Sequence, residues 1–111
     1  MNFENLDVWK RSARLSADIY KATAKLKDFG FRDQLTRSGL SVPSNIAEGM
    51  TREGDKEKRR FLDIAYSSLA EVRTQIYIGI DVGYLESNNG QLWIEETKQL
   101  SAMLTSLKRK F

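Results

Sequence analysis

The fold is decided by the stretch SVPSNIAEG at residues 41–49. With the residues before it, this stretch predicts a helix over residues 31–50. At about 100° per residue, one side of this helix carries Phe31, Leu35, Gly39, Val42, Ile46 and Met50. The opposite side carries Arg37, Ser41, Asn45 and Glu48. A helix needs only its apolar side to fold, so a neighbouring subunit, another partner or a ligand could contact the polar side.

Pro43 lies inside this predicted helix and should bend it. A proline has no N–H group, and its ring crowds the carbonyl group four residues earlier. That carbonyl belongs to Gly39, whose flexible backbone can relieve the crowding. We therefore expect a kinked helix rather than a break.

Three further segments show the helical spacing of apolar residues. They span residues 6–27, 55–82 and 91–110, with Asp55 as the expected N-cap of the middle segment. Glycine-containing segments separate the four helices. Four helices with short connections predict an all-α fold, namely an antiparallel up-down-up-down four-helix bundle formed by a single domain of residues 1–111.

The first predicted helix has an apolar arc that covers roughly half of its circumference, against the ~100° of a simple surface helix. The residues of this arc are Leu6, Trp9, Ala13, Leu15, Ile19, Tyr20, Ala24 and Leu26. An arc of this width has two explanations. The helix contacts other subunits, or it is wedged between two helices of its own bundle.

The composition excludes several kinds of site. The 111 residues include no Cys and no His, which excludes disulfides, cysteine nucleophiles, Ser-His-Asp triads and histidine-ligated metals. The first residues lack the basic start and apolar run of a signal peptide, and no stretch approaches the ~20 apolar residues of a membrane span. We therefore expect a cytoplasmic protein without metal or cofactor. Its net charge of +3 permits nucleic-acid binding without requiring it.

Several motifs resemble those of one protein family. They are LDVWK at residues 6–10, IY at 19–20, Arg37 followed by SVPSNIAEG, Arg52, FLDIA at 61–65, Ser68-Leu69 and Glu71. From about residue 3 to residue 85, the chain resembles the four-helix bundle proteins of the 23S rRNA intervening-sequence family, also called S23 ribosomal proteins. The chain departs from the family pattern at Ser67, where Gly is common, and at Arg73, where an acidic residue is common.

This resemblance implies an architecture more than an activity. Family members are small antiparallel four-helix bundles, those characterised resemble barrel-like homopentamers, and some are encoded within insertions in bacterial 23S rRNA genes. A related branch, the accessory variability determinant of diversity-generating retroelements, binds nucleic acid and a reverse transcriptase. The resemblance thus implies a homo-oligomer, expected to be a pentamer, with RNA, DNA, a reverse transcriptase or another protein as further partners.

The polar side of the second predicted helix forms the first candidate site, together with Glu71 at the edge of the third helix's core face. A carboxylate in such a position needs a partner, and Arg37 is the expected one. One interpretation is a hydrogen-bonded network across helices or subunits, and the other is a surface for nucleic acid or another partner. The residues concerned are Arg37, Ser41, Asn45, Glu48 and Glu71.

Basic residues form the second candidate site. The first predicted helix carries six basic and two acidic residues, and a second basic cluster precedes the third helix, interleaved with acidic residues. Clustered Lys and Arg bind phosphate backbones, although ordinary solvated helix faces show the same pattern. The candidate nucleic-acid contacts are Lys10, Arg11, Arg14, Lys21, Lys25, Arg52, Lys56, Lys58, Arg59 and Arg60.

A third candidate is the row Tyr66, Arg73, Tyr77 and Tyr84 beside the core face of the third predicted helix. Aromatic rings beside arginine can stack on nucleic-acid bases. Such rows also form core boundaries and subunit interfaces, so the pattern leaves these readings open.

No motif supports catalysis. Gly54 lacks the spacing of a phosphate-binding loop, and the adjacent Glu95 and Glu96 point in different directions on a helix. The sequence therefore predicts a non-enzymatic oligomeric protein that associates with RNA through its basic surface. The alternative is a protein interaction scaffold with no nucleic-acid role, whose charges serve only solubility.

Overall fold

A computed structural model describes residues 2–111, and all regular structure in that part of the chain is helical. A short 3-10 helix, η1 (Phe3–Asn5), precedes the four long helices. These are α1 (Asp7–Thr23), α2 (Phe29–Met50), α3 (Asp55–Asp81) and α4 (Ser87–Lys108). The prediction of an all-α fold with four helices is confirmed.

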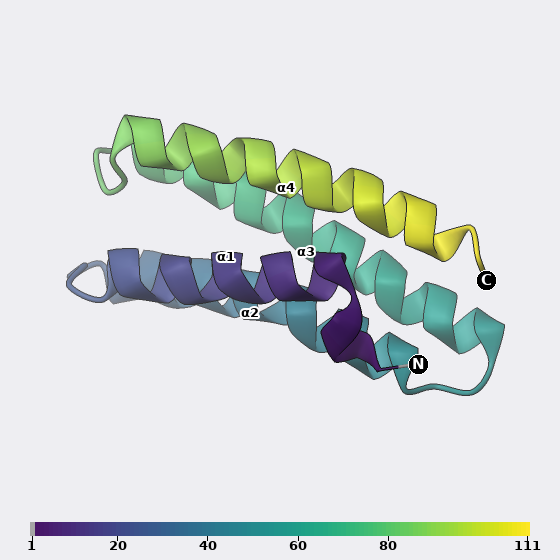
Figure 1. Ribbon diagram of the computed structural model, residues 1–111. Coiled ribbons are helices and arrows are strands. Elements are labelled where there is room, and N and C mark those ends of the chain that lie inside the picture. The colour runs from purple at the N-terminus through teal and green to yellow at the C-terminus, as the bar shows by residue number, and fades with distance from the viewer. Residues whose placement is uncertain (1) are drawn as a thin grey trace.

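The helices form an elongated bundle that measures 43 × 22 × 20 Å along its principal axes. Figure 1 shows the α1–α2 and α3–α4 loops at one end, and the α2–α3 loop with both chain ends at the other. The largest interface between helices joins α2 to α3, and the smallest joins α1 to α4. The bundle is therefore built around the α2–α3 pair, with a looser seam between α1 and α4.

The core is aliphatic and draws on all four helices. Ile19, Leu35, Leu69 and Leu100 are each fully buried, and each comes from a different helix. Burying one such side chain stabilises the fold by about 1.5–3 kcal/mol. The helical spacing of apolar residues in the sequence corresponds to these core faces.

The connection between α1 and α2 begins earlier than predicted. α1 ends at Thr23 rather than at residue 27, because the chain turns there and the Leu26 N–H donates to the Thr23 carbonyl at 3.0 Å. α2 begins at Phe29, where the Asp28 carboxylate accepts the Phe31 N–H as an N-cap.

α4 begins at Ser87, four residues before the predicted start at residue 91. The Glu86 carboxylate accepts the N–H groups of Asn88 and Asn89 at 3.1 and 2.7 Å, which satisfies two unpaired donors of the first turn. Asp55 is also not the N-cap that its position suggested. Gly54 caps α3, and Asp55 lies in the first turn, where its charge favours the helix N-terminus.

α2 continues through Pro43 without a break. Gly39, four residues earlier, lies against α1: a Cβ atom there would lie 3.4 Å from Ile19 Cδ1 and 3.9 Å from the Ser16 Cα atom. These are ordinary contact distances, so Gly39 packs against α1 one turn before the proline without being required by space.

Candidate nucleic-acid and partner interfaces

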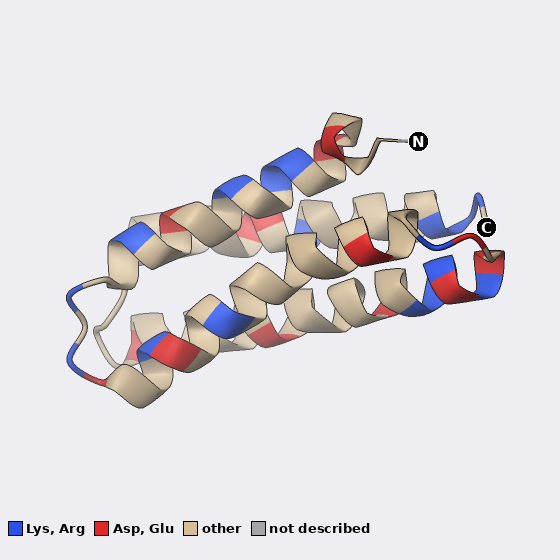
Figure 2. Ribbon diagram, turned by 90° about the horizontal axis from the view of Figure 1, so that it is seen from below, with Lys and Arg blue, Asp and Glu red and all other residues tan. Residues whose placement is uncertain are grey.

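One basic face follows the solvent side of α1. Lys10, Lys21 and Lys25 are exposed, and none of the ion pairs within residues 2–111 includes them. Arg14 is also exposed and reaches Asp18 only at 3.8 Å, a weak surface contact. Figure 2 shows basic positions recurring along α1 and into the loop that follows it. Phosphate groups could approach these cations without displacing a strong internal partner.

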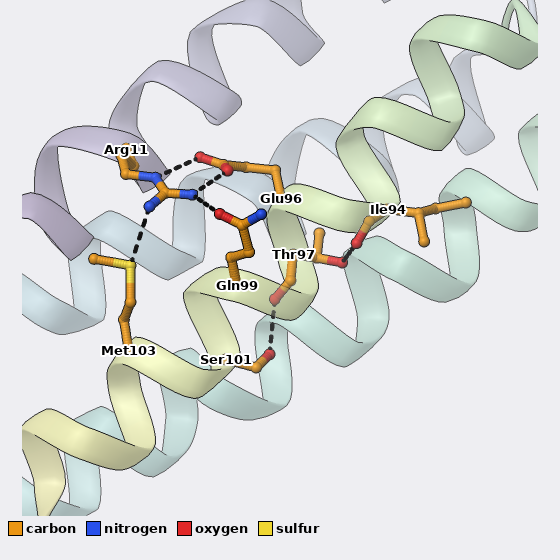
Figure 3. Close-up of polar contacts among 7 residues, drawn as sticks. All are labelled: Arg11, Ile94, Glu96, Thr97, Gln99, Ser101 and Met103. Atoms are coloured by element: carbon orange, nitrogen blue, oxygen red, sulfur yellow. Dashed lines mark hydrogen bonds and ion pairs between the residues drawn. The ribbon is translucent and has the colours of Figure 1, made fainter.

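Arg11 has different surroundings because it faces α4. Its Nε donates to Glu96 at 3.0 Å, and one of its terminal nitrogens donates to Glu96 at 2.5 Å and to Gln99 at 2.6 Å. The hydrogen bond with Glu96 raises the pKa of Arg11 above its usual value. Figure 3 shows the guanidinium group turned toward these side chains and toward Met103. Arg11 therefore bridges α1 and α4, and four of its five N–H groups already donate hydrogen bonds.

Arg52 and Arg60 are also engaged with acidic neighbours. Arg52 pairs with Glu48 at 2.8 Å, one turn earlier in the chain, and Arg60 pairs with Glu57 at 2.9 Å. The hydrogen bond from Arg60 lowers the pKa of Glu57. Both guanidinium groups also lie over the Phe61 ring, at 4.9 and 4.5 Å from its centroid. These two arginines thus hold the α2–α3 turn together.

Lys58 and Arg59 contact backbone carbonyl groups. Lys58 donates to the carbonyl of Met50, the last residue of α2, and to that of Arg52 just beyond it, where a cation interacts favourably with the helix C-terminus. Arg59 donates to the carbonyl of Phe111, the last residue of the sequence. Of the five basic residues predicted in this turn, only Lys56 is exposed without an ion pair or hydrogen bond among the described residues.

The polar side of α2 divides into two parts. The Ser41 and Ser68 hydroxyls lie 2.8 Å apart across the α2–α3 interface, and the Asn45 amide donates to the Ser41 carbonyl and hydroxyl oxygens at 2.8 and 2.9 Å. Ser38 donates to Gln75 at 2.6 Å, again from α2 to α3. These bonds satisfy polar groups inside the bundle. Sequence reasoning had not proposed Ser38 or Gln75, because neither residue stands out until α2 and α3 are paired.

Arg37 and Glu71 face solvent beside this interface. Both line a shallow cavity of about 320 Å³ between α2 and α3, and both are exposed. Within residues 2–111 no ion pair joins them, so the pairing expected from the sequence does not form. Both charges are therefore available to a partner.

The aromatic row of α3 also has mixed roles. Arg73 donates to the Thr97 and Ser101 hydroxyls of α4 at 2.9 and 3.1 Å, so it bridges two helices. The Tyr84 hydroxyl donates to Asp28 at 2.9 Å, which joins the two loops at one end of the bundle. Tyr66 and Tyr77 are each 48% exposed.

An apolar groove of about 510 Å³ lies between α1 and α2. Its lining contains no charged residue and includes Trp9, Ala17, Tyr20, Leu40, Pro43 and Ala47. The wide apolar arc of the first helix was the sequence signal for this surface. The arc could not locate the groove, because the α2 wall consists of residues outside the apolar side predicted for that helix.

Two kinds of function lack support in the described part of the chain. No group of three acidic residues in residues 2–111 could hold a metal ion. None of the described helices combines the length and the apolar character needed to cross a membrane.

Comparisons with known proteins place the chain among helical proteins without an assigned activity. Residues 4–106 match the sequence description of the 23S rRNA-intervening sequence proteins. The structure is similar to a crystal structure of a protein of unknown function from the S23 ribosomal protein family of Bacteroides thetaiotaomicron, with a TM-score of 0.84 and 22% sequence identity over 91% of this chain and 97% of that chain. This likeness shows the fold alone. No curated protein matches the sequence.

Proposed function

Because this chain belongs to the 23S rRNA-intervening sequence protein family, we propose that it is a non-enzymatic helical protein that associates with RNA through α1. The observation that carries the proposal is the exposed basic surface formed by Lys10, Arg14 and Lys21 on α1 and by Lys25 in the turn that follows it. Clustered lysine and arginine release counterions from a phosphate backbone and bind it without regard to base sequence.

The structure narrows the set of basic residues that this proposal needs. Five of the ten candidates have their donors engaged by internal partners: Arg11, Arg52, Lys58, Arg59 and Arg60. An RNA phosphate would have to displace those partners. Lys25, two residues beyond the end of α1, and Lys56 are the remaining candidates outside α1. A cytoplasmic location fits a protein that associates with RNA.

The same proposal includes self-assembly. The bundle is proposed to be an antiparallel up-down-up-down one, and several copies are proposed to assemble into a homopentameric barrel. The positions of the loops in Figure 1 support the first part. The apolar groove between α1 and α2 supports self-assembly, because an uncovered groove of this kind marks an interaction surface. The number five comes from the family resemblance.

RNA binding can be tested by the fluorescence anisotropy of a labelled structured RNA at low and raised salt. The double variant Lys21→Glu/Lys25→Glu should bind at least ~10-fold more weakly than the original chain, and its affinity should depend less on salt. The control is Lys98→Glu/Arg109→Glu, which changes the net charge equally on α4 and at the residue that caps its C-terminus. If both variants lose the same affinity for RNA, the loss reflects net charge rather than a binding surface on α1. If neither variant nor salt changes the affinity, the proposal is contradicted.

A protein scaffold is the second candidate function, and the apolar groove is the observation that favours it. Such a scaffold would bind another protein, a reverse transcriptase being one example that the family resemblance supplies. A scaffold would bind its partner in a salt-tolerant manner and would be indifferent to Lys21→Glu/Lys25→Glu. RNA association predicts the opposite result in both measurements.

A further inference from the structure

The groove between α1 and α2 is uncovered although its walls are apolar. Tyr20 on α1 and Leu40 on α2 are 46% and 47% exposed, and both line it. Small residues such as Ala13, Ala17 and Ala47 also line the groove, and they allow another helix to approach closely. Uncharged walls of this kind are suited to contact with protein side chains.

The two sides of the apolar arc of α1 have different surroundings. Leu15 and Ile19 are buried in the core and Trp9 packs against it, whereas Ala13 and Tyr20 line the groove. A helix that packs only within its own bundle needs the first group alone. The second group is therefore accounted for by a surface outside the bundle.

The borders of the groove are basic. Lys10 and Lys21 directly follow the groove residues Trp9 and Tyr20 in the sequence, and Arg37 lies one turn before Leu40 on α2. All three basic side chains are exposed, and no ion pair in the described chain includes them. A partner surface with exposed apolar side chains and nearby acidic side chains would match both the apolar walls and the basic borders of the groove.

The same chain carries such a surface on α3. Ile78 and Val82 are 50% and 55% exposed, and their spacing of four residues places them on one face. Glu71 lies on that face two turns earlier, and Asp81 lies beside Val82. Between Arg73 and the end of α3, the one charged residue is Asp81. The α3 surface is thus complementary in charge to the groove.

We propose that the α1–α2 groove of one copy receives the Ile78 and Val82 face of α3 from a second copy. This interface rests on the self-assembly proposed above and specifies which surfaces meet. Because the two surfaces are different parts of the chain, each copy has one groove and one α3 face to offer. Contacts of this head-to-tail type close into a ring when the rotation between neighbours allows it.

Two single substitutions and their mixture test the interface by light scattering coupled to size exclusion. The original chain should be larger than the 12.7 kDa monomer. Leu40→Glu, which places an acidic group in the groove, and Ile78→Lys, which places a basic group on the α3 face, should each give monomers. An equimolar mixture should give a species of two chains, because the Leu40→Glu subunit still offers its α3 face to the intact groove of the other.

Leu92→Glu is the matched control, since Leu92 is 70% exposed and lies outside both surfaces. It should assemble like the original chain, and far-ultraviolet circular dichroism should show that all variants keep their helices. Full assembly of Leu40→Glu or Ile78→Lys, or a mixture that stays monomeric, would overturn the interface while leaving self-assembly intact. A monomeric original chain would overturn both, and the anisotropy assay reads RNA association independently of either result.

Discussion

Arg11 and Arg14 lie three residues apart on α1, and their guanidinium groups have different surroundings. Arg11 donates to Glu96 and Gln99 of α4, whereas 68% of the Arg14 side chain is exposed. Residues three positions apart on a helix point about 60° away from each other, and here that rotation separates a bridge between helices from a solvated cation. Only Arg14 remains available to a phosphate group.

Asp28 provides a pH-dependent contact at one end of the bundle. Its carboxylate accepts the Phe31 N–H at 3.1 Å and the Tyr84 hydroxyl at 2.9 Å. Both bonds lower the pKa of Asp28, and the bond from the Phe31 N–H has the larger effect. A carboxyl group with a lowered pKa in the folded state stabilises the fold above its unfolded pKa, about 4. That stabilisation is lost as the pH falls through the folded pKa.

We therefore predict that Asp28→Ala lowers the melting temperature near neutral pH. The difference from the original chain should shrink as the pH decreases from about 5 into the acid range. Thermal unfolding followed by circular dichroism across this range is the measurement. Tyr84→Phe, which keeps the ring against Phe31, should show a smaller effect of the same sign. A difference that stays constant down to the lowest pH would mean that the ionised carboxylate does not contribute.

The sequence could identify which residues are basic but could not show which basic residues have partners. Lys10 and Arg11 both fall within the polar arc of the first predicted helix, and only the position of α4 separates their roles. The partner of Arg59 is the Phe111 carbonyl, which lies 52 residues further along the chain. No spacing rule along one helix contains such information.

Gly49 allows α3 to pass close to the end of α2. A Cβ atom at this position would lie 3.0 Å from Phe61 Cβ and 3.3 Å from the Lys58 carbonyl oxygen. The second neighbour is backbone, so it can move only if the α2–α3 turn moves with it. The glycine thus sets the distance between the two helices that share the largest interface.

Replacing Gly49 by Ala should lower the free energy of unfolding by up to about 2 kcal/mol net, because overpacking costs about 1–3 kcal/mol. The gain in helix propensity, about 1 kcal/mol, offsets only part of this cost. Urea denaturation measures the change. Gly30→Ala is the control, because its Cβ atom would meet only Asp28 Oδ1 at an ordinary 3.6 Å, and that variant should be equally or slightly more stable. Equal stability of the two variants would contradict the role given to Gly49.

Helix positions were predictable where apolar spacing is regular, and less so where glycine has a packing role. The third helix was expected at residues 55–82 and spans Asp55–Asp81. The start of α4 was missed because Ser87, Asn88, Asn89 and Gly90 have turn-forming composition. Gly90 instead faces α3, where a Cβ atom would lie 2.5 Å from Ile80 Cδ1. The absence of a side chain at Gly90 lets α3 and α4 lie close together, and the sequence alone does not show this close approach.

The interfaces between the helices of the bundle differ in size. α1 and α4 share the smallest interface, and the side-chain hydrogen bonds that join them within residues 2–111 all come from Arg11. Segments with fewer buried contacts open at lower free energy than the rest of a fold. The α1 helix should therefore separate from the bundle before the α2–α3 pair does. Composition could not predict this order, because it depends on how much surface each pair of helices shares.

Native-state hydrogen exchange tests this order in the monomeric Leu40→Glu variant, where no second copy covers α1. Amides of α1 should exchange faster than those in the middle of α2 and α3. Adding Arg11→Ala should accelerate exchange in α1 by several-fold and leave the α2–α3 pair nearly unchanged, since a partly exposed charged hydrogen bond contributes about 1 kcal/mol. Slower exchange in α1 than in α3 would show that the seam is not the weak point.

Both chain ends leave the bundle at the end that also carries the α2–α3 loop (Figure 1). A tag or cargo domain fused to either end would therefore emerge from that one pole and leave the opposite pole clear. In a closed ring every copy is related to the next by rotation about one axis, so the fused domains of all copies would stand at one level along that axis. Such an assembly would present its cargo as a multivalent cluster, with the gain in avidity that a raised local concentration brings.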